Sequence, residues 1–224
     1  MIAEVNGIKL YYEKSGEGRP LILVHGNGED HTIFDEAVRA LRGSFCCYCV
    51  DSRCHGRSED TRELHYRDMA TDMIAFIKAL DLRDVVFYGF SDGGIIGLMA
   101  ASRCERITTL IVSGANTNPR AVKWWLRPLV AAGKLITKDK KLSLMLYEPD
   151  IADAELRNIR AATLVLAGSR DLIPEKETRH IADAIPGAEL QILPGEDHGS
   201  YIVHSTKIAG LIRGFARTTK EGKA

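Results

Sequence analysis

The apolar positions of this chain fall into two alternating patterns. Short apolar runs of strand length occur at residues 20–24, 45–50, 85–90, 107–112 and 161–167. Such runs are typical of strands buried on both faces of a sheet. Between them, apolar residues recur at helical spacing, as from Tyr66 to Leu80, where Met69, Met73 and Phe76 share one face. Strands that alternate with helices predict an α/β fold with a mostly parallel, doubly wound sheet.

The remaining segments complete this pattern. Residues 2–7 and 8–14 predict two strands joined at Asn6-Gly7, a favoured hairpin turn. Residues 190–193 predict the last of eight strands. Further helices are expected at residues 31–41, 174–185 and 202–216. The polar residues 218–224 predict a frayed end.

Residues 115–160 interrupt the alternation. They contain Trp124-Trp125, several basic residues and two helical patterns, without a clear strand. They fall near the C-terminal edge of the predicted sheet, where ligands bind in such folds. The sequence therefore predicts a single domain, residues 1–224, with a short helical cap inserted at about 115–160.

The composition narrows the expected partners. Thirty basic residues balance thirty acidic ones, which leaves no electrostatic footprint for nucleic acid or an anionic membrane. No apolar stretch reaches the length of a membrane span, and the N-terminus lacks the pattern of a signal peptide. We therefore expect a small-molecule substrate, and neither nucleic acid nor membrane as a partner.

The cysteines predict neither a metal site nor a redox pair. Three of the five lie in the apolar run at 45–50, where Cys46 and Cys49 have C-x-x-C spacing. Side chains three apart on a strand point to opposite faces, so these two thiols are not expected to meet. Free, mostly buried thiols are typical of a reducing cytoplasm.

The segment Gly89-Phe90-Ser91-Asp92-Gly93 has the G-x-S-x-G spacing of a nucleophile elbow. It follows an apolar run and precedes a small-residue helical pattern, so it predicts a strand, a sharp turn and a helix. Such a turn presents the serine hydroxyl in the open and leaves little room for a Cβ at the glycines. The N–H groups at the helix start favour a developing oxyanion. The alternative is a glycine-containing turn with an incidental serine.

A nucleophilic serine needs a base and an acid that orients the base. His198 is the best candidate base because it lies in a Gly-flanked loop after the last strand. The alternative is that His198 is simply an exposed surface residue. Asp171 follows the preceding strand and is the best candidate acid, although an Asp also suits a helix start. Asp197 ranks lower because it cannot easily orient the imidazole next to it in the chain.

The order Ser91, Asp171, His198 matches the nucleophile, acid and base order of the α/β-hydrolase fold. The chain resembles an α/β-hydrolase over nearly its whole length. Residues 25–28 resemble the family's His-Gly oxyanion loop, and residues 51–58 resemble its Asp-x-Arg-Gly-x-Gly-x-Ser loop. The resemblance implies that Ser91 is the nucleophile, His198 the base and Asp171 the orienting acid.

The resemblance also implies an oxyanion hole formed by the backbone N–H groups of Asn27 and Asp92. Residues 168–171 resemble the family's Gly-x-x-Asp acid turn. Cys54 departs from the family because it stands where a glycine is usual. We interpret Cys54 as inert packing, with a reactive thiol as the alternative.

The insert is short for a cap in this family, which implies an open pocket. Four large side chains of the insert either line that pocket or only pack the cap onto the body: Trp124, Trp125, Met145 and Tyr147.

These features predict a serine hydrolase of small carboxylic esters, lactones or thioesters. It would act through an acyl-enzyme on Ser91, without a metal or organic cofactor. The serine argues against the dehalogenases and epoxide hydrolases of this fold, which use an aspartate nucleophile. A carbon–carbon bond hydrolase or a perhydrolase with the same triad is an alternative, as is a non-catalytic binding protein on the same scaffold.

Asp92 adds a prediction about specificity. The elbow is similar to that of biphenyl-hydrolase-like α/β-hydrolases, a group that includes α-amino-acid ester hydrolases. A carboxylate beside the acyl site would pair with a substrate ammonium group and repel anionic acyl groups. The alternative is that the Asp92 side chain turns away and supports the elbow.

Overall fold

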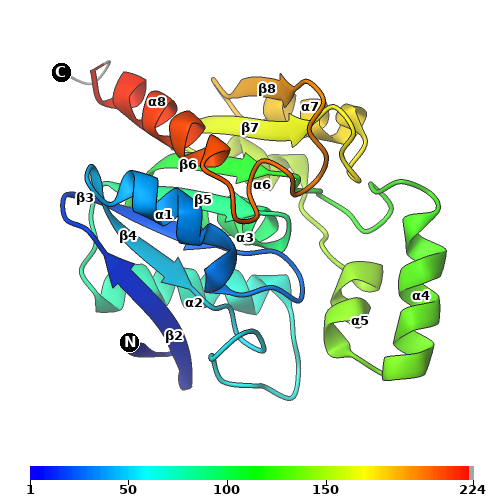
Figure 1. The fold of residues 1–224 in the computed structure, drawn as a ribbon. Coiled ribbons are helices and arrows are strands. Elements are labelled where there is room, and N and C mark those ends of the chain that lie inside the picture. Colours follow the sequence, from blue (N-terminus) through cyan, green and yellow to red (C-terminus); the bar gives the residue numbers. More distant parts are fainter. Residues whose placement is uncertain (222–224) are drawn as a thin grey trace.

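The computed structural model describes residues 1–221 and places eight strands in one sheet (Figure 1). The strands are β1 (Ile2–Val5), β2 (Ile8–Ser15), β3 (Arg19–Val24), β4 (Phe45–Val50), β5 (Val85–Phe90), β6 (Ile107–Ser113), β7 (Ala162–Gly168) and β8 (Glu189–Leu193). Their order is β1-β2-β4-β3-β5-β6-β7-β8. The pairs β1–β2 and β2–β4 are antiparallel and the others are parallel. The predicted mostly parallel, doubly wound sheet is confirmed.

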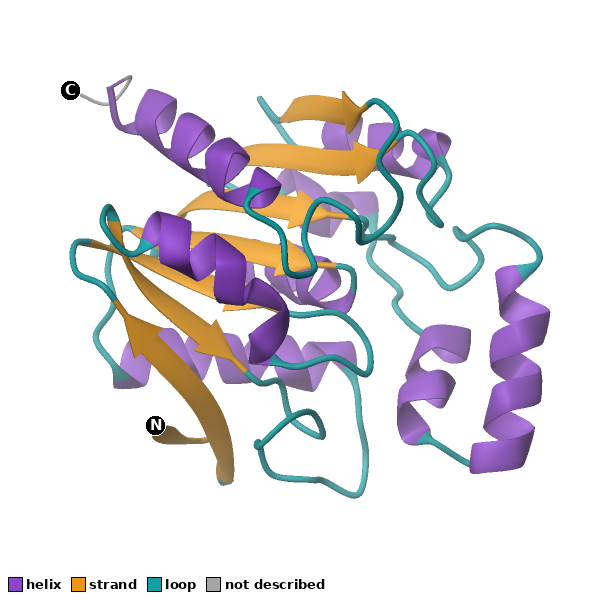
Figure 2. Cartoon of the chain, viewed as in Figure 1, coloured by secondary structure: helices purple, strands orange, loops and turns teal. Residues whose placement is uncertain are grey.

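Helices cover both faces of this sheet (Figure 2). One core lies beneath η1 (His31–Phe34), α1 (Asp35–Leu41) and α8 (Lys207–Glu221). The other lies beneath α2 (Tyr66–Ala79), α3 (Asp92–Ala101), α6 (Asp153–Arg157) and α7 (Glu175–Ala184). The β4 side chains divide between the cores, with Cys46 in one and Cys49 in the other. The prediction that these two thiols point apart is confirmed, and all five cysteines are free.

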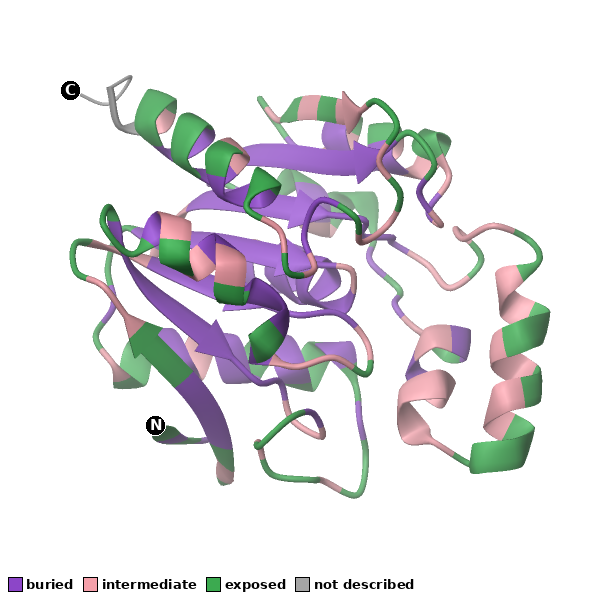
Figure 3. Cartoon of the chain, viewed as in Figure 1, coloured by how far each residue is buried: buried purple, intermediate pink, exposed green. Residues whose placement is uncertain are grey.

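The remaining two helices, α4 (Leu126–Thr137) and α5 (Lys140–Tyr147), form a hairpin beside the body of the molecule. In Figure 3 the central strands of the sheet are mostly buried, β4 and β5 throughout, whereas no part of α4 is buried. The start of α5 is tied to the body because the Lys140 ammonium donates to the Thr61 carbonyl. Its end is tied because Glu148 accepts a hydrogen bond from the Tyr66 N–H at 3.0 Å. The insert also contains the short helix α6, which the two predicted helical patterns did not include.

Two predicted helices differ from those observed. The helix expected at 31–41 divides into η1 and α1, and the helix expected from Ile202 begins only at Lys207. His204 has a left-handed φ of 47°, which interrupts a helix there, and the Ser205 hydroxyl then accepts the Lys207 N–H at 3.3 Å. The helix continues to Glu221, so residues 218–221 are helical in the structure, and the frayed end expected from residue 218 stays a prediction. Residues 222–224 lie outside the described part.

Candidate active site

The sharp turn at Ser91 has the strained backbone that its sequence predicts. Ser91 lies between β5 and α3 with φ 52° and ψ −113°. A Cβ added at Gly89 would approach the Gly93 carbonyl oxygen to 2.0 Å, and one at Gly93 would approach the Val24 carbonyl oxygen to the same distance. Neither position can hold a side chain without moving backbone. The two glycines therefore let the serine stand at the carboxyl end of the sheet.

Ser91, His198 and Asp171 form one chain of contacts. The Ser91 Oγ lies 3.1 Å from His198 Nε2, and His198 Nδ1 lies 2.6 Å from Asp171 Oδ1. The Asp171 side chain is buried, whereas that of His198 is 19% exposed. An imidazole that donates from Nδ1 to a buried carboxylate presents Nε2 as an acceptor for the serine proton. The three predicted residues thus meet in the geometry of a nucleophile, a base and an orienting acid.

The acid and the base are held by their own loops. Asp171 Oδ1 also accepts the Ile173 N–H at 2.9 Å, just before α7. Asp197, the lower-ranked acid, shapes the loop that carries His198. Its carboxylate accepts the N–H groups of Gly199 at 3.0 Å and Ser200 at 2.9 Å. The adjacent carboxylate therefore positions the base through the backbone, while Asp171 contacts the ring.

Two residues that support the imidazole were missed in the sequence. Gly114, directly after β6, has a φ of 61°, and a Cβ there would lie 2.6 Å from His198 Cε1. The ring of Phe90 lies 5.0 Å from the imidazole, measured between centroids. A Ser-Gly pair after a predicted central strand is the signal that could have indicated a close approach at Gly114.

The two predicted oxyanion donors lie on neighbouring segments. Asn27 follows β3 and Asp92 begins α3, and no group within residues 1–221 accepts a hydrogen bond from either backbone N–H. Two uncommitted N–H groups beside a serine are what an oxyanion hole requires. The neighbouring Gly26 N–H is already taken by the Glu29 carboxylate at 2.9 Å. Burial of Glu29 raises the pKa of that carboxyl.

His25 supports the predicted oxyanion loop, residues 25–28, from inside the protein. Its Nδ1 lies 2.8 Å from the Gly26 carbonyl oxygen, and its Nε2 accepts the Ser52 N–H at 3.0 Å. Because Nε2 accepts a hydrogen bond, the ring is neutral and carries its proton on Nδ1. Burial, reinforced by the neighbouring His55, lowers the pKa of His25 to about 4.

The Asp92 carboxylate is turned into the protein. It is 4% exposed, and it accepts hydrogen bonds from the Tyr66 hydroxyl at 2.6 Å and the Asn27 side-chain amide at 2.8 Å. Burial raises the pKa of Asp92, and the two donors oppose that rise. The carboxylate thus connects the two predicted oxyanion residues, Asn27 and Asp92, to each other. Its predicted pairing with a substrate ammonium group stays a prediction, without an open carboxylate oxygen to support it.

Residues 51–58 form a structural loop. Cys54 has a φ of 64°, a conformation that explains why a glycine is usual there, and its Sγ lies 3.2 Å from Thr61 Oγ1. The ligand atoms of Asp30, His31 and Asp51 lie close enough together to hold a metal ion. However, Asp51 already accepts the His31 N–H at 2.8 Å, and Asp30 caps η1. We assign these groups to holding the loop.

The four predicted pocket residues of the cap lie on or beside the hairpin. Trp124 is 84% exposed, Tyr147 is largely exposed, and Trp125 and Met145 are less so. One contact reaches the oxyanion loop, because the Asn27 side-chain amide donates to the Lys141 carbonyl at 3.3 Å. A role of the four large side chains in lining the pocket stays a prediction.

Comparison with known proteins places this chain in a family. The AB hydrolase superfamily protein YisY of Bacillus subtilis is 25% identical, and the match covers 94% of this chain and 96% of that protein. Serine hydrolase BPHL of Mus musculus is 26% identical, with 94% and 84% covered. The structure of the esterase EaEST from Exiguobacterium antarcticum has the same fold, with a TM-score of 0.83, 20% identity and 98% of each chain covered. The alpha/beta hydrolase family matches residues 21–155, more than half of the sequence, and the chain therefore belongs to the alpha/beta hydrolase family.

Proposed function

We propose that this chain is a serine hydrolase that cleaves small carboxylic esters, lactones or thioesters through an acyl-enzyme on Ser91. The observation that carries the proposal is the continuous contact from Ser91 Oγ through the His198 imidazole to the Asp171 carboxylate. The strained turn at Ser91 and the two uncommitted N–H groups beside it support the same chemistry. The mouse relative is named a serine hydrolase, and the Exiguobacterium structure is named an esterase.

Acylation begins when Ser91 Oγ attacks the carbonyl carbon and His198 Nε2 takes the serine proton. The imidazolium donates from Nδ1 to Asp171, which stays ionised and stabilises the new positive charge. The carbonyl oxygen becomes an oxyanion that the N–H groups of Asn27 and Asp92 would hold. Collapse of the tetrahedral intermediate breaks the bond to the leaving oxygen or sulfur, and His198 gives that atom its proton.

Deacylation repeats these steps with water. His198 removes a proton from water, which attacks the acyl carbon and forms a second tetrahedral intermediate at the same two N–H groups. His198 then returns the proton to Ser91 Oγ as the ester bond breaks. The products are the carboxylic acid and the alcohol or thiol, and the enzyme is restored. No step needs an electron acceptor or a metal.

A fluorophosphonate probe tests the proposed nucleophile. We expect covalent labelling of the folded chain that disappears in Ser91→Ala. The matched control is Ser102→Ala, because Ser102 lies at the opposite end of α3 and its hydroxyl donates to the Met99 carbonyl. Labelling of the control should match the wild type. Folded wild-type protein that takes up no probe would contradict the proposal and favour a non-catalytic binding protein on this scaffold.

A panel of esters, lactones and thioesters tests the substrate class. Turnover of p-nitrophenyl esters that disappears in Ser91→Ala supports the proposal. A carbon–carbon bond hydrolase or a perhydrolase would instead show its main turnover on a β-diketone or with hydrogen peroxide as the acyl acceptor. An α-aminoacyl ester and its deaminated twin, each with wild type and Asp92→Asn, test the charge preference. Equal kcat/KM for the twins in wild type would end that prediction.

A further inference from the structure

The outward side of α4 carries a continuous row of apolar side chains. Every exposed residue of α4 before Thr137 is apolar, and with Trp125 these residues recur at intervals of three and one, which places them on one helical face. We call this face the apolar stripe: Trp125, Pro128, Leu129, Ala132, Leu135 and Ile136. Leu135 is 82% exposed and Ile136 is 83% exposed. A globular helix normally turns such a face toward the core, so the stripe is unpartnered.

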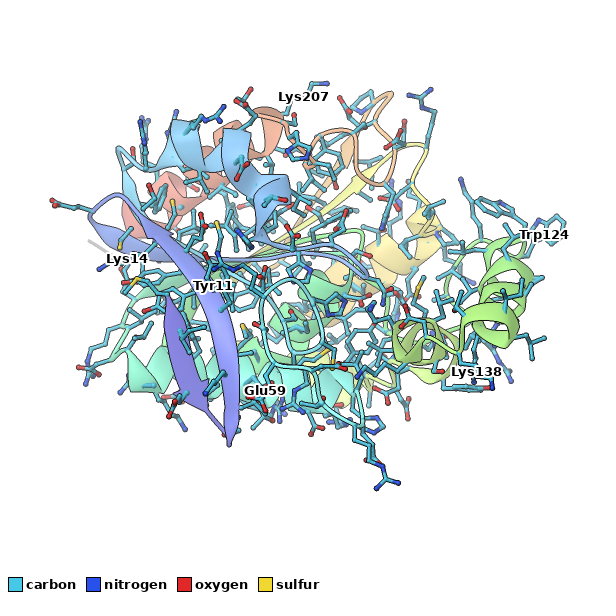
Figure 4. The ribbon with its side chains drawn as sticks, turned by 60° about the horizontal axis from the view of Figure 1, so that its bottom comes forward. Tyr11, Lys14, Glu59, Trp124, Lys138 and Lys207 are labelled. Atoms are coloured by element: carbon cyan, nitrogen blue, oxygen red, sulfur yellow. The ribbon has the colours of Figure 1, made fainter. Side chains whose placement is uncertain are left out.

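The stripe lies on the outermost helix of the molecule. In Figure 1, α5 stands between α4 and the body. Figure 4 shows Trp124 and Lys138, which flank α4, along the side of the molecule that the hairpin forms. The opposite face of α4 is turned toward α5, where the Arg127 guanidinium donates to the Leu146 carbonyl and the Lys134 ammonium lies over the Tyr147 ring. The apolar stripe therefore lies on the outside of the molecule, where a broad surface can contact it along its whole length.

The charges around the stripe are almost all positive. Residues 120–141 contain seven basic residues and one acidic residue, a local excess of six positive charges in a chain whose net charge is zero. Lys140 pairs with Asp60 and Lys141 pairs with Asp139. Within residues 1–221 the other five make no ion pair with a carboxylate: Arg120, Lys123, Arg127, Lys134 and Lys138. Arg127 and Lys134 lie on the face of α4 toward α5, so the cations nearest the stripe are Lys123 and Lys138 at its two ends. These two lysines favour an occupant that has an apolar surface and carries negative charge.

We propose that the α4 face of the hairpin docks on the surface of an anionic phospholipid bilayer. An amphipathic helix with basic residues on one face and Trp and Leu on the other lies in the plane of the lipid headgroups. Lys123 and Lys138 lie at the two ends of the stripe, where they would contact lipid phosphates. A second copy of the chain fits less well, because two surfaces of the same charge would be brought together. The bilayer was not expected from the overall charge balance, because the excess is confined to the hairpin.

This docking differs from membrane insertion. Among residues 1–221, no helix has the length and hydrophobicity needed to cross a bilayer. The twelve residues of α4 extend about 18 Å, and the helix would lie along the surface. The proposal does not depend on the hydrolase chemistry, and its test does not use turnover.

The intrinsic fluorescence of the chain measures the docking directly. Both tryptophans of the sequence, Trp124 and Trp125, stand at the start of the stripe. With vesicles of phosphatidylcholine and phosphatidylglycerol we expect a blue shift of the emission and co-sedimentation of the protein. Vesicles of phosphatidylcholine alone should give much less of both, and added salt should weaken the binding.

Two sets of variants separate the apolar contribution from the charge. The triple variant Leu129→Ser/Leu135→Ser/Ile136→Ser should lose the blue shift. The double variant Lys123→Gln/Lys138→Gln should bind anionic vesicles about fivefold more weakly for each lysine removed. The matched controls are Ile2→Ser and Lys9→Gln, which alter an exposed isoleucine and an exposed lysine of the body. All these positions are exposed except Lys123, which is half-buried, and far-UV circular dichroism checks that each variant is folded.

Three results would overturn the proposal. The first is the absence of both the shift and co-sedimentation with anionic vesicles. The second is a blue shift that grows with protein concentration without lipid, which would assign the stripe to a second copy. The third is equally strong binding of soluble polyglutamate by the wild type and the triple variant, together with unchanged vesicle binding by that variant. That result would assign the surface to an acidic polymer or protein that binds by charge alone.

Discussion

The elbow helix α3 and the outer cap helix α4 are both mainly apolar, yet they have opposite surroundings. All ten residues of α3 are buried, and none of the twelve residues of α4 is. Helix α3 leaves β5 through a tight turn and packs directly onto the sheet, where Gly97 lets it approach Phe87. Helix α4 belongs to an insert that leaves the sheet. Apolar composition therefore predicts burial only when the chain path returns the helix to the core.

The two helices also divide the roles that we assign. The body carries the proposed triad, the two proposed oxyanion donors and the buried groups that hold them. Within residues 1–221 the hairpin contributes one hydrogen bond to that site, which the Asn27 side-chain amide donates to the Lys141 carbonyl, and it carries the exposed apolar stripe. Substitutions that affect one region and leave the other intact test this division.

The largest effect is expected from the proposed catalytic groups of the body. Ser91→Ala and His198→Ala should each lower ester turnover on the order of 10³-fold or more, and their combination should cost little further, because a triad acts as a unit. Asp171→Asn should also lower turnover strongly, since asparagine offers the imidazole the wrong partner. The measurement is kcat/KM on a p-nitrophenyl ester, with the folded state checked by circular dichroism. Near-normal turnover in folded His198→Ala would show that another residue is the base.

A matched pair of truncations compares the two helices directly. Ile96→Ala in α3 removes a fully buried side chain and should lower the free energy of unfolding by about 2–5 kcal/mol. Ile136→Ala in α4 removes an exposed side chain and should change that free energy by no more than about 0.5 kcal/mol. Urea unfolding measures both. A large loss for Ile136→Ala would mean that the hairpin packs onto the body in solution.

Gly114→Ala tests the close approach beneath the imidazole. The added methyl group would have to displace the His198 ring, and a displacement of about 1 Å should lower kcat roughly 10²-fold. The matched control is Gly187→Ala, because Gly187 also has a positive φ but has no heavy atom near the new Cβ. Both variants carry the same kind of backbone strain, so only Gly114→Ala should lose activity beyond its loss of stability. Equal activity in the two variants would show that the space at Gly114 does not position the His198 ring.

The smallest effects are expected from two histidines whose pKa values move in opposite directions. Burial lowers the pKa of His25 to about 4, so the unfolded chain binds more protons between about pH 6.5 and 4, and the free energy of unfolding falls as the pH drops through that window. The Glu148 carboxylate raises the pKa of His65, so the stability from this pair is present below about pH 6.5 and is lost as the pH rises through the higher pKa.

Unfolding curves of His25→Gln and His65→Gln from pH 4 to 8 measure these contributions. Relative to wild type, His25→Gln should show a flatter decline of stability toward acid. His65→Gln should lose stability mainly at low pH, where the bond that joins α2 to the end of α5 is charged. Identical pH profiles for wild type and His25→Gln would contradict the neutral, buried state of that ring.

The sequence by itself determined the local elements and the candidate chemistry. Apolar runs indicated strands that the structure confirms, because a strand buried on both faces needs apolar residues at every position. The glycine spacing around Ser91 indicated the turn, and the position of His198 and Asp171 after their strands indicated one edge of the sheet. The predicted ends of the helices were less accurate where one or two residues decide them, as with His204 and Ser205 before α8.

Only the tertiary structure decided how distant segments meet. His198 and Ser91 lie 107 positions apart, and the strand order brings them within hydrogen-bond distance. The space beneath the imidazole at Gly114 and the direction of the Asp92 carboxylate likewise depend on neighbours that are remote in sequence. The exposure of α4 was also decided only by the tertiary structure. The periodicity of a helix defines its apolar face but does not determine whether the fold covers that face.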